Sequence, residues 1–277
     1  RIDRTAVALI EGERRVSYGE LNDRVNRLVH VLVTRGVTPG DRVAILARNC
    51  VAYVELELAA AKLGVLVAAL NWRLSASELS HCVALAEPSL IVVSEGYADT
   101  ISDTDIADSP QIVLGAEYET CLARAENREP LIRGGGEDGL VILYTSGTTG
   151  RPKGAVISHR ALIARGAVFG MDLGIISNET FVAWAPFFHM ASTDQALATL
   201  MRGGSVAIID GYNAHEFERT IESEHIGWLP LIPGMIESLL KDLGGRARRI
   251  KGIRAIGAMA DLVAMHHITQ ATTVLNA

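Results

Sequence analysis

Residues 140–162 read LVILYTSGTTGRPKGAVISHRAL, and this stretch decides the fold. Its first five residues form a continuous apolar run, which is typical of a strand buried on both faces of a parallel sheet. Ser158 can cap a helix that runs through residues 161–168. The small and hydroxyl-bearing residues in between predict a loop at the carboxyl end of a parallel strand. Open α/β sheets bind ligands at this position.

The loop carries groups that suit phosphate. Glycines let backbone N–H groups approach an anion closely, hydroxyl groups add hydrogen-bond donors, and a lysine adds a positive charge. These residues are Thr145, Ser146, Gly147, Thr148, Thr149, Gly150, Lys153 and Gly154. The sequence therefore predicts a site for a polyphosphate.

This loop differs from a Walker A loop, which needs glycine immediately before the lysine and serine or threonine after it. Here Pro152 precedes Lys153 and Gly154 follows. Because proline has no N–H group, it cannot complete the same ring of donors. The alternative to a phosphate site is a solvated turn with a surface lysine.

Strands and helices alternate on both sides of the loop. Ser-x-x-Glu capping boxes at residues 17–20 and 75–78 each predict the start of a helix. Apolar runs predict strands at residues 42–47, 65–70, 90–93, 111–114, 180–185, 206–209, 227–231 and 253–257. This order predicts right-handed crossovers and a mostly parallel arrangement, so the fold class is α/β. Apart from the strand at 111–114, residues 94–138 are expected to form irregular surface.

Composition excludes several classes of protein. The chain has 277 residues and a net charge of −6 that is spread without long runs, so the basic surface of a nucleic-acid-binding protein is missing. The longest apolar stretch, residues 56–70, is too short to cross a bilayer and contains Glu57 and Lys62. The 3 cysteines are far apart in the sequence, which favours reduced thiols and a cytoplasmic location.

Residues 145–154, TSGTTGRPKG, resemble the signature loop of the adenylate-forming superfamily, which includes acyl-CoA synthetases, firefly-type luciferases and nonribosomal adenylation domains. Other landmarks of that superfamily occur in the same order. They are Val16-Ser-Tyr-Gly-Glu-Leu21, Gly40-Asp-Arg-Val-Ala44 with Asn49, Lys62-Leu-Gly64 with Asn71 and Arg73-Leu74, and Pro186-Phe-Phe-His189. The similarity covers nearly the whole chain and is strongest to synthetases for fatty or aryl acids.

This resemblance implies two packed, mostly parallel sheets flanked by helices, as in the large N-terminal domain of an adenylate-forming enzyme, incomplete at its C-terminal end. It divides the chain into one α/β subdomain from residues 1–36 and 172–277 and a second from residues 37–171. The second subdomain would contain the phosphate-binding loop. The mobile C-terminal domain of the family would be absent.

The resemblance also implies a two-step reaction. A carboxylate attacks the α-phosphate of ATP bound to Mg²⁺, which gives an acyl-adenylate and pyrophosphate, and a thiol such as CoA then displaces AMP. Thr145 to Gly150 and Lys153 would hold the β- and γ-phosphates, because the enzyme must align two anions and screen the developing charge. The expected partners are therefore a small carboxylic acid, ATP and CoA, with a homo-oligomer left open.

Three segments bear on the acid and the adenine. A His or aromatic residue at the position of His189 lies beside the acyl pocket in relatives that activate fatty or aryl acids, whereas amino-acid-activating relatives usually have Asp there. This resemblance predicts a non-amino acid as substrate. Residues 253–259 occupy the position of the segment that lies against adenine and lines the acyl tunnel. Gly257 and Ala258 match its nucleotide side and Met259 its acyl side, although the alignment can shift by one residue.

The catalytic residues and the Mg²⁺ ligand are expected beyond residue 277, in a Gly-x-Thr-Glu motif and a later domain. The chain also begins without methionine, so it is expected to be an inactive piece of a longer ligase. Two alternatives stay open. One is an adenylating enzyme whose acceptor is not CoA, and the other is a non-catalytic nucleotide-binding module if the gene ends here.

Overall fold

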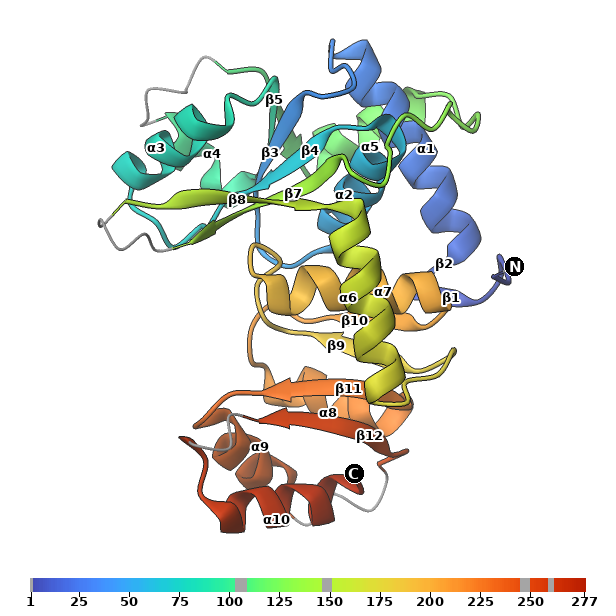
Figure 1. The fold of residues 1–277 in the computed structure, drawn as a ribbon, viewed down its shortest axis with the longest axis vertical. Coiled ribbons are helices and arrows are strands. Elements are labelled where there is room, and N and C mark those ends of the chain that lie inside the picture. The colour runs from blue at the N-terminus through green and yellow to red at the C-terminus, as the bar shows by residue number, and fades with distance from the viewer. Residues whose placement is uncertain (1, 103–108, 146–150, 245–249, 259–261) are drawn as a thin grey trace.

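The lower sheet in Figure 1, sheet A, combines strands from both ends of the chain. Its strands are β1 Val7–Glu11, β2 Arg14–Ser17, β9 Thr180–Ala183, β10 Ser205–Ile208, β11 Ile226–Leu231 and β12 Ile253–Ala258. The order is β12-β11-β9-β10-β1-β2 in this computed structural model, which describes residues 2–102, 109–145, 151–244, 250–258 and 262–277. Neighbouring strands are parallel except for the β1–β2 hairpin.

The upper sheet, sheet B, comes from one continuous part of the sequence. Its strands are β3 Arg42–Leu46, β4 Leu66–Ala69, β5 Leu90–Ser94, β6 Gln111–Leu114, β7 Gly139–Thr145 and β8 Lys153–Ser158. Their order is β6-β5-β3-β4-β7-β8, and only β7 and β8 are antiparallel among the described strands. The predicted α/β fold with two mostly parallel sheets is thus confirmed.

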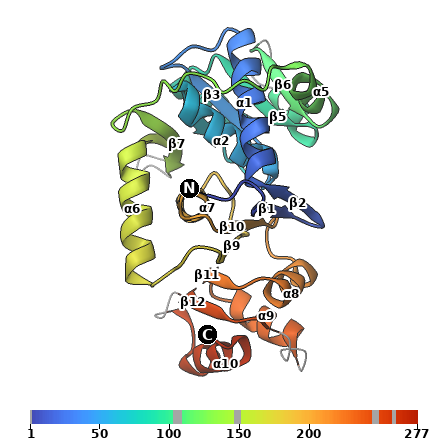
Figure 2. The same cartoon turned by 90° about the vertical axis from the view of Figure 1, so that its right-hand side faces the viewer.

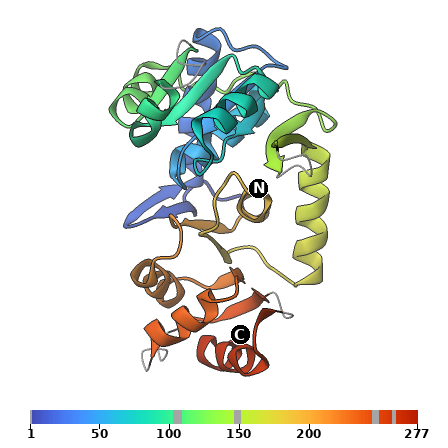
Figure 3. The ribbon, with the colours of Figure 1, turned by 90° about the vertical axis from the view of Figure 1, so that its left-hand side faces the viewer.

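Helices lie between the sheets and on their outer faces. They are α1 Tyr18–Thr34, α2 Val51–Leu63, α3 Ala76–Ala86, α4 Ala98–Ser102, α5 Ala116–Arg124, α6 His159–Asp172, α7 Met190–Arg202, α8 Ala214–Ser223, α9 Met235–Leu243 and α10 Met265–Leu275. In Figures 2 and 3, α6 runs along the outside from the level of β7 to that of β11. Within the described ranges, no helix is both long and apolar enough to span a bilayer.

Both predicted capping boxes start helices. Ser17 accepts a hydrogen bond from the backbone N–H of Glu20 at 3.2 Å, and the Glu20 carboxylate accepts one from the Ser17 N–H at 2.8 Å. Ser75 and Glu78 repeat this arrangement at the start of α3. Each box satisfies two donors that a helix end would otherwise leave free.

The structure contains three features that the apolar pattern does not predict. Helices α4 and α5 lie within the segment expected to be irregular, so that expectation is wrong at both. In α5 only Tyr118 and Leu122 are buried, four residues apart on one face, and its acidic outer face hides the helical period. The β1–β2 hairpin turns at Gly12, whose positive φ of 58° suits glycine. Strand β8 is mostly exposed, so backbone pairing rather than apolar burial defines it.

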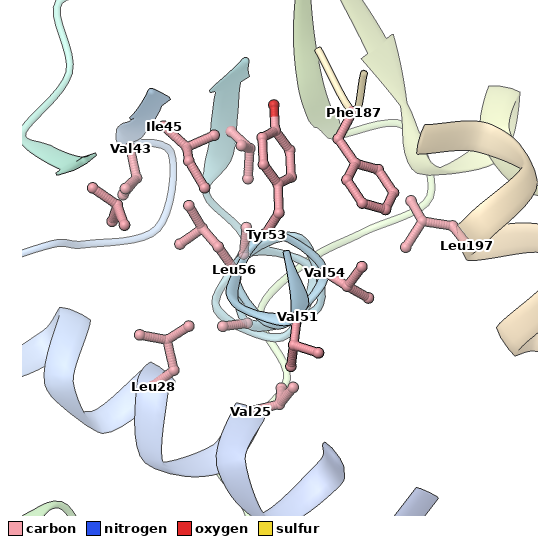
Figure 4. Close-up of a cluster of buried hydrophobic side chains, with 14 of the residues drawn as sticks. Val25, Leu28, Val43, Ile45, Val51, Tyr53, Val54, Leu56, Phe187 and Leu197 are labelled. Atoms are coloured by element: carbon pink, nitrogen blue, oxygen red, sulfur yellow. The ribbon is translucent and has the colours of Figure 1, made fainter. Parts of the chain in front are cut away.

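The largest hydrophobic core is shared by the two sheets, with α2 near its centre (Figure 4). Side chains of α2 point to α1 on one side, to β3 on a second and to the residues before and within α7 on a third. The labelled residues of this core are Val25, Leu28, Val43, Ile45, Val51, Tyr53, Val54, Leu56, Phe187 and Leu197. A helix buried on several sides requires apolar residues around its circumference, as α2 has.

The proposed subdomain boundaries follow the division of strands between the sheets. Sheet A uses residues 7–17 and 180–258, and sheet B uses residues 42–158. We therefore propose residues 1–36 with 172–277 as one subdomain and 37–171 as the other. The boundaries stay a prediction, because one core joins both parts.

A buried ion pair links α1 and α2 in this core. Arg24 Nε donates to Glu55 Oε1 at 2.5 Å, and the Tyr118 hydroxyl donates to Glu55 Oε2 at 2.6 Å. The Glu55 side chain is 0% exposed. A second carboxylate, that of Glu119, lies 2.7 Å from the Arg24 guanidinium. The charge of Glu55 is therefore compensated inside the protein and not by water.

Replacing Arg24 with alanine is expected to lower the free energy of unfolding by about 3 kcal/mol, because it leaves a buried carboxylate without its cation. Urea unfolding at neutral pH measures this change. The matched control is Arg4→Ala, which breaks an exposed pair with Asp23 and is expected to leave stability nearly unchanged. Equal effects of the two substitutions would contradict the assignment of Arg24 as the compensating charge.

Candidate active site

The predicted phosphate-binding loop lies at the tip of the β7–β8 hairpin. Thr145 ends β7 and faces Lys153, the first residue of β8, across the strand pair. Both side chains are exposed. Ser146 to Gly150 lie outside the described residues. The expectation that the loop leads from β7 directly into a helix is wrong, because β8 comes first and Ser158 then caps α6.

Helix α3 supports this hairpin on its flank. The Tyr144 hydroxyl donates to the Cys82 carbonyl at 2.8 Å, and the His81 Nε2–H donates to the Pro152 carbonyl at 3.1 Å. Burial raises the pKa of Tyr144 above its ordinary value, so this phenol stays protonated and keeps its hydrogen bond. The two ends of the loop are thus fixed to the same helix.

Gly154 lies beside the loop and close to a side chain of β7. A Cβ added to Gly154 would lie 3.0 Å from the Cγ2 of Ile142 on β7. A larger residue at this position would therefore need the Ile142 side chain to shift. Next to it, the Lys153 ammonium forms no ion pair with the residues that the structure describes, so its charge is available to an anion.

His189 lies at the N-terminus of α7, after β9 in sheet A. Its Nδ1 accepts a hydrogen bond from the Ala191 N–H at 3.2 Å. A ring nitrogen that accepts carries no proton, so in this arrangement the proton is on Nε2. The exposed imidazole therefore offers an N–H donor to its surroundings and no negative charge.

The residues before His189 alternate in direction. Phe187 is buried and stacks on Tyr53 of α2, with ring centroids 5.2 Å apart. Phe188 instead lies edge-on to Trp72, at 6.3 Å. The loop is thus anchored in the shared core by Phe187, while Phe188 is partly buried against the edge of this core and His189 is exposed.

Gly257 and Ala258 end β12, and Met259 lies outside the described residues. A Cβ added to Gly257 would lie 2.2 Å from the Trp228 ring, so no larger residue fits there without moving that ring. Ala258 is exposed at the carboxyl end of the strand. Whether either residue meets a nucleotide stays a prediction.

The strand ends bring these segments to one side of the molecule. In Figure 1 the end of β7, the start of β8, the start of α7 and the arrowheads of β11 and β12 all lie toward the left. This is the carboxyl edge of both sheets, where parallel α/β sheets bind ligands. The predicted phosphate and acyl segments therefore share one face, although one belongs to sheet B and the other to sheet A.

A cluster of arginine and aromatic side chains on this face was not assigned a role from the sequence. Arg48 and Arg73 each lie 4.4 Å from the centroid of the Trp72 ring. Both arginines are exposed, and Arg48 also pairs with Asp210 at 3.1 Å. Arg48 follows β3, and Trp72 and Arg73 follow β4. Basic residues just beyond strand ends were the signal available in the sequence.

The apolar hollow of about 420 Å³ between α1, α2, α6 and α7 is a separate feature. Leu21, Val25, Leu58, Leu162 and Leu197 are among the residues that line it. Thr145, Lys153, His189, Gly257 and Ala258 are not among them. We therefore assign the active site to the strand ends and not to this hollow.

Known proteins share both the sequence pattern and the fold. Feruloyl-CoA synthase from Amycolatopsis sp is 30% identical over 257 residues, which are 92% of this chain and 51% of that protein. The long-chain-fatty-acid–CoA ligase FadD13 of Mycobacterium tuberculosis is 31% identical over 217 residues, 76% of this chain and 43% of that protein. The chain thus spans about half the length of these relatives.

The inhibitor-bound N-terminal domain of FACL13 from M. tuberculosis has a TM-score of 0.88 and 25% identity, covering 97% of this chain and 69% of that chain. ATP-bound MatB from Rhodopseudomonas palustris has a TM-score of 0.82 and 25% identity, covering 98% and 55%. The family model described as "AMP-binding enzyme" matches residues 1–275. The resemblance read from the loop and its accompanying motifs is confirmed, and the chain belongs to the family of AMP-binding enzymes.

Proposed function

We propose that the complete protein uses ATP to activate a non-amino carboxylic acid as an acyl-adenylate and then transfers the acyl group to CoA. The observation that carries this proposal is the β7–β8 hairpin. Its exposed Lys153 has no carboxylate partner among the described residues, and it lies at the strand edge that also carries His189. The Lys153 ammonium, on a hairpin that α3 holds in place by hydrogen bonds, suits the outer phosphates of ATP.

In this proposal the hairpin holds the nucleotide and supplies no nucleophile. Thr145 and Lys153 bind the β- and γ-phosphates and stabilise pyrophosphate as it leaves, and Ser146 to Gly150 complete the loop. The acid's own carboxylate oxygen attacks the α-phosphorus. Gly257 and Ala258 lie on the adenine side, and Met259 on the acyl side. No catalytic residue is assigned in this chain, which spans about half the length of its relatives, so the reaction is proposed for the complete protein.

The substrate class rests on His189. An imidazole whose Nδ1 is used by the α7 cap presents an N–H donor, which cannot form an ion pair with an ammonium group. The names of the relatives point the same way, since they include ligases for long-chain fatty acids, indoleacetate and 2-succinylbenzoate. We therefore favour fatty or aryl acids over α-amino acids.

Mg²⁺ would enter as the ATP complex and neutralise phosphate charge. The described residues bring together no group of three or more His, Cys, Asp or Glu side chains that could hold a metal, so no ligand for it is assigned in this chain. Arg73 beside Trp72 offers a further positive surface for the phosphates of a co-substrate such as CoA. The three unpaired thiols agree with the proposed cytoplasmic location.

One relative supports a second candidate. A fatty acid–[acyl-carrier-protein] ligase, ScoC of Streptomyces coeruleorubidus, is 30% identical over 256 residues, 90% of this chain and 49% of that protein. A carrier-protein thiol could therefore replace CoA as the acceptor. Adenylation would be unchanged, so only the second step distinguishes the two.

Acid-dependent ATP–pyrophosphate exchange by the complete gene product tests the proposal. We expect exchange with fatty or aryl acids at least about 100-fold faster than with any α-amino acid, because position 189 has an imidazole and not a carboxylate that could pair with an ammonium group. Thioester formation with CoA and with a carrier protein is then compared. Exchange driven best by amino acids would refute the substrate class, and no exchange with any acid would favour a non-catalytic nucleotide-binding module.

A further inference from the structure

We propose that Asn49 is a positioning residue that fixes the distance between the nucleotide side and the acid side of the active site. This inference rests on the proposed function. The hairpin that would hold the phosphates belongs to sheet B, whereas His189 follows a strand of sheet A. Attack on the α-phosphorus needs both substrates aligned within a fraction of an ångström, so the two sheets must be held in a fixed relation.

Asn49 follows a strand of sheet B, but its side chain forms hydrogen bonds with backbone groups at the ends of sheet A strands and in the loop after β9. It follows β3, and its Nδ2 lies 3.2 Å from the Ala183 carbonyl, 2.8 Å from the Ala185 carbonyl and 3.0 Å from the Ile209 carbonyl. Its Oδ1 accepts from the Phe187 N–H at 2.9 Å. Two N–H groups thus serve three carbonyls, with at least one N–H shared.

The partners of Asn49 are backbone groups at the ends of two neighbouring strands and in the loop that follows. Ala183 ends β9 and Ile209 follows β10, and the Ile209 N–H still donates to the Ala183 carbonyl at 3.1 Å. The Ile209 carbonyl lies beyond this last bond between the two strands. A side-chain amide has the same donor and acceptor groups as the backbone and can extend the pairing. Asp would offer no donor in its place, and Ala would leave the Ile209 carbonyl and the Phe187 N–H without a hydrogen-bond partner among the described residues.

The same loop is also held from α7. Ser192 Oγ donates to the Ala185 carbonyl at 2.6 Å, and Thr193 Oγ1 donates to the Phe187 carbonyl. Residues 185–187 therefore form hydrogen bonds on two sides, with Asn49 after β3 and with the first turn of α7, whose N-cap is His189. With the His189 ring fixed by its own cap, the loop has little freedom to move.

Asn49 touches neither of the proposed substrate-binding side chains, Lys153 and His189, in the hydrogen bonds of the described residues. Its effect would pass through the backbone of residues 185–187 to His189. A change at Asn49 should therefore alter the use of the acid while leaving the hairpin able to bind ATP. This separation distinguishes positioning from a general loss of stability.

The test uses Asn49→Ser and Asn49→Asp in the complete gene product, with steady-state ATP–pyrophosphate exchange as the readout. We expect kcat/KM for the acid to fall about 30-fold in both variants, and KM for ATP to stay within about threefold. The matched control is Asn213→Ala, which removes the asparagine that caps α8, the helix after β10 of sheet A. This variant should change neither kcat/KM for the acid nor KM for ATP by more than about threefold. The inference would be overturned if KM for ATP rose as much as kcat/KM for the acid fell, or if kcat/KM for the acid did not change.

A second readout does not depend on activity. In the 277-residue chain, the ¹⁵N signals of the His189 ring report which nitrogen carries the proton. We expect Asn49→Ser to shift these signals away from the single Nε2–H form, and unchanged signals would overturn the positioning role. If the wild-type protein shows no exchange with any acid, the proposed function is contradicted. The ¹⁵N signals of the His189 ring would still decide the role of Asn49.

Discussion

Replacing Lys153 with alanine in the complete enzyme is expected to slow acid-dependent ATP–pyrophosphate exchange by roughly 10²- to 10³-fold, or about 3 to 4 kcal/mol of activation free energy. The proposed reason is that the ammonium group screens charge on pyrophosphate as it leaves. The exposed position of Lys153 at the start of β8 means that its loss should barely affect folding. Exchange rates and urea unfolding are therefore measured on the same variant.

The matched control for this experiment is Arg151→Ala, which removes the same charge two residues away from an exposed position. We expect the exchange rate of this variant to stay within about fivefold of the wild-type rate, because water and salt screen an exposed charge that does not contact the phosphates. Lys153→Arg should recover part of the rate. If Lys153→Ala keeps the wild-type rate, or if Arg151→Ala loses as much activity, the phosphate role of Lys153 is wrong.

A second large effect is expected from the buried carboxyl of Glu57 on α2. Its Oε1 lies within hydrogen-bond distance of Thr193 Oγ1, at 3.2 Å, and its Oε2 has no hydrogen-bond partner among the described residues. Burial raises the pKa of Glu57 to about 8 from its ordinary value of 4.5. Between these two pH values the folded state keeps a proton that the unfolded chain has released, so stability falls as pH rises through that window.

Glu57→Gln stays neutral at every pH and should not show this decline. Its free energy of unfolding should equal that of the wild type below about pH 4.5 and exceed it by roughly 3 to 5 kcal/mol above pH 8. Urea unfolding at pH 5, 7 and 9 measures the difference. Glu126→Gln, at an exposed carboxylate, is the control and should show almost no pH-dependent difference. Parallel pH profiles for wild type and Glu57→Gln would contradict the buried, protonated carboxyl.

Most of the fold was predictable because its strands are short apolar runs between helix signals. The capping boxes at Ser17 and Ser75 predict the starts of α1 and α3 correctly, since each requires two specific side chains at a fixed spacing. Strand β8 could not be predicted in this way. It buries little apolar surface, and its pairing with β7 depends on a turn whose conformation the apolar pattern does not encode.

The residues of the candidate site could be predicted from the sequence, but the hydrogen bonds that hold their two sheets together could not. The composition of the loop identifies Lys153, and the motif resemblance identifies His189. That these residues belong to different sheets joined through Asn49 follows only from topology, because its hydrogen bonds to Ala183 and Ile209 span more than 130 residues of sequence. Its partners are backbone carbonyl and N–H groups, which leave no signature in the sequence.

The central claim is that the β7–β8 hairpin holds the outer phosphates of ATP. A crystal structure of the protein with a non-hydrolysable ATP analogue tests this most directly. We predict phosphate oxygens of the β- and γ-groups within about 3 Å of Thr145 Oγ1 and Lys153 Nζ. A well-ordered nucleotide whose phosphates lie away from both atoms would contradict the claim.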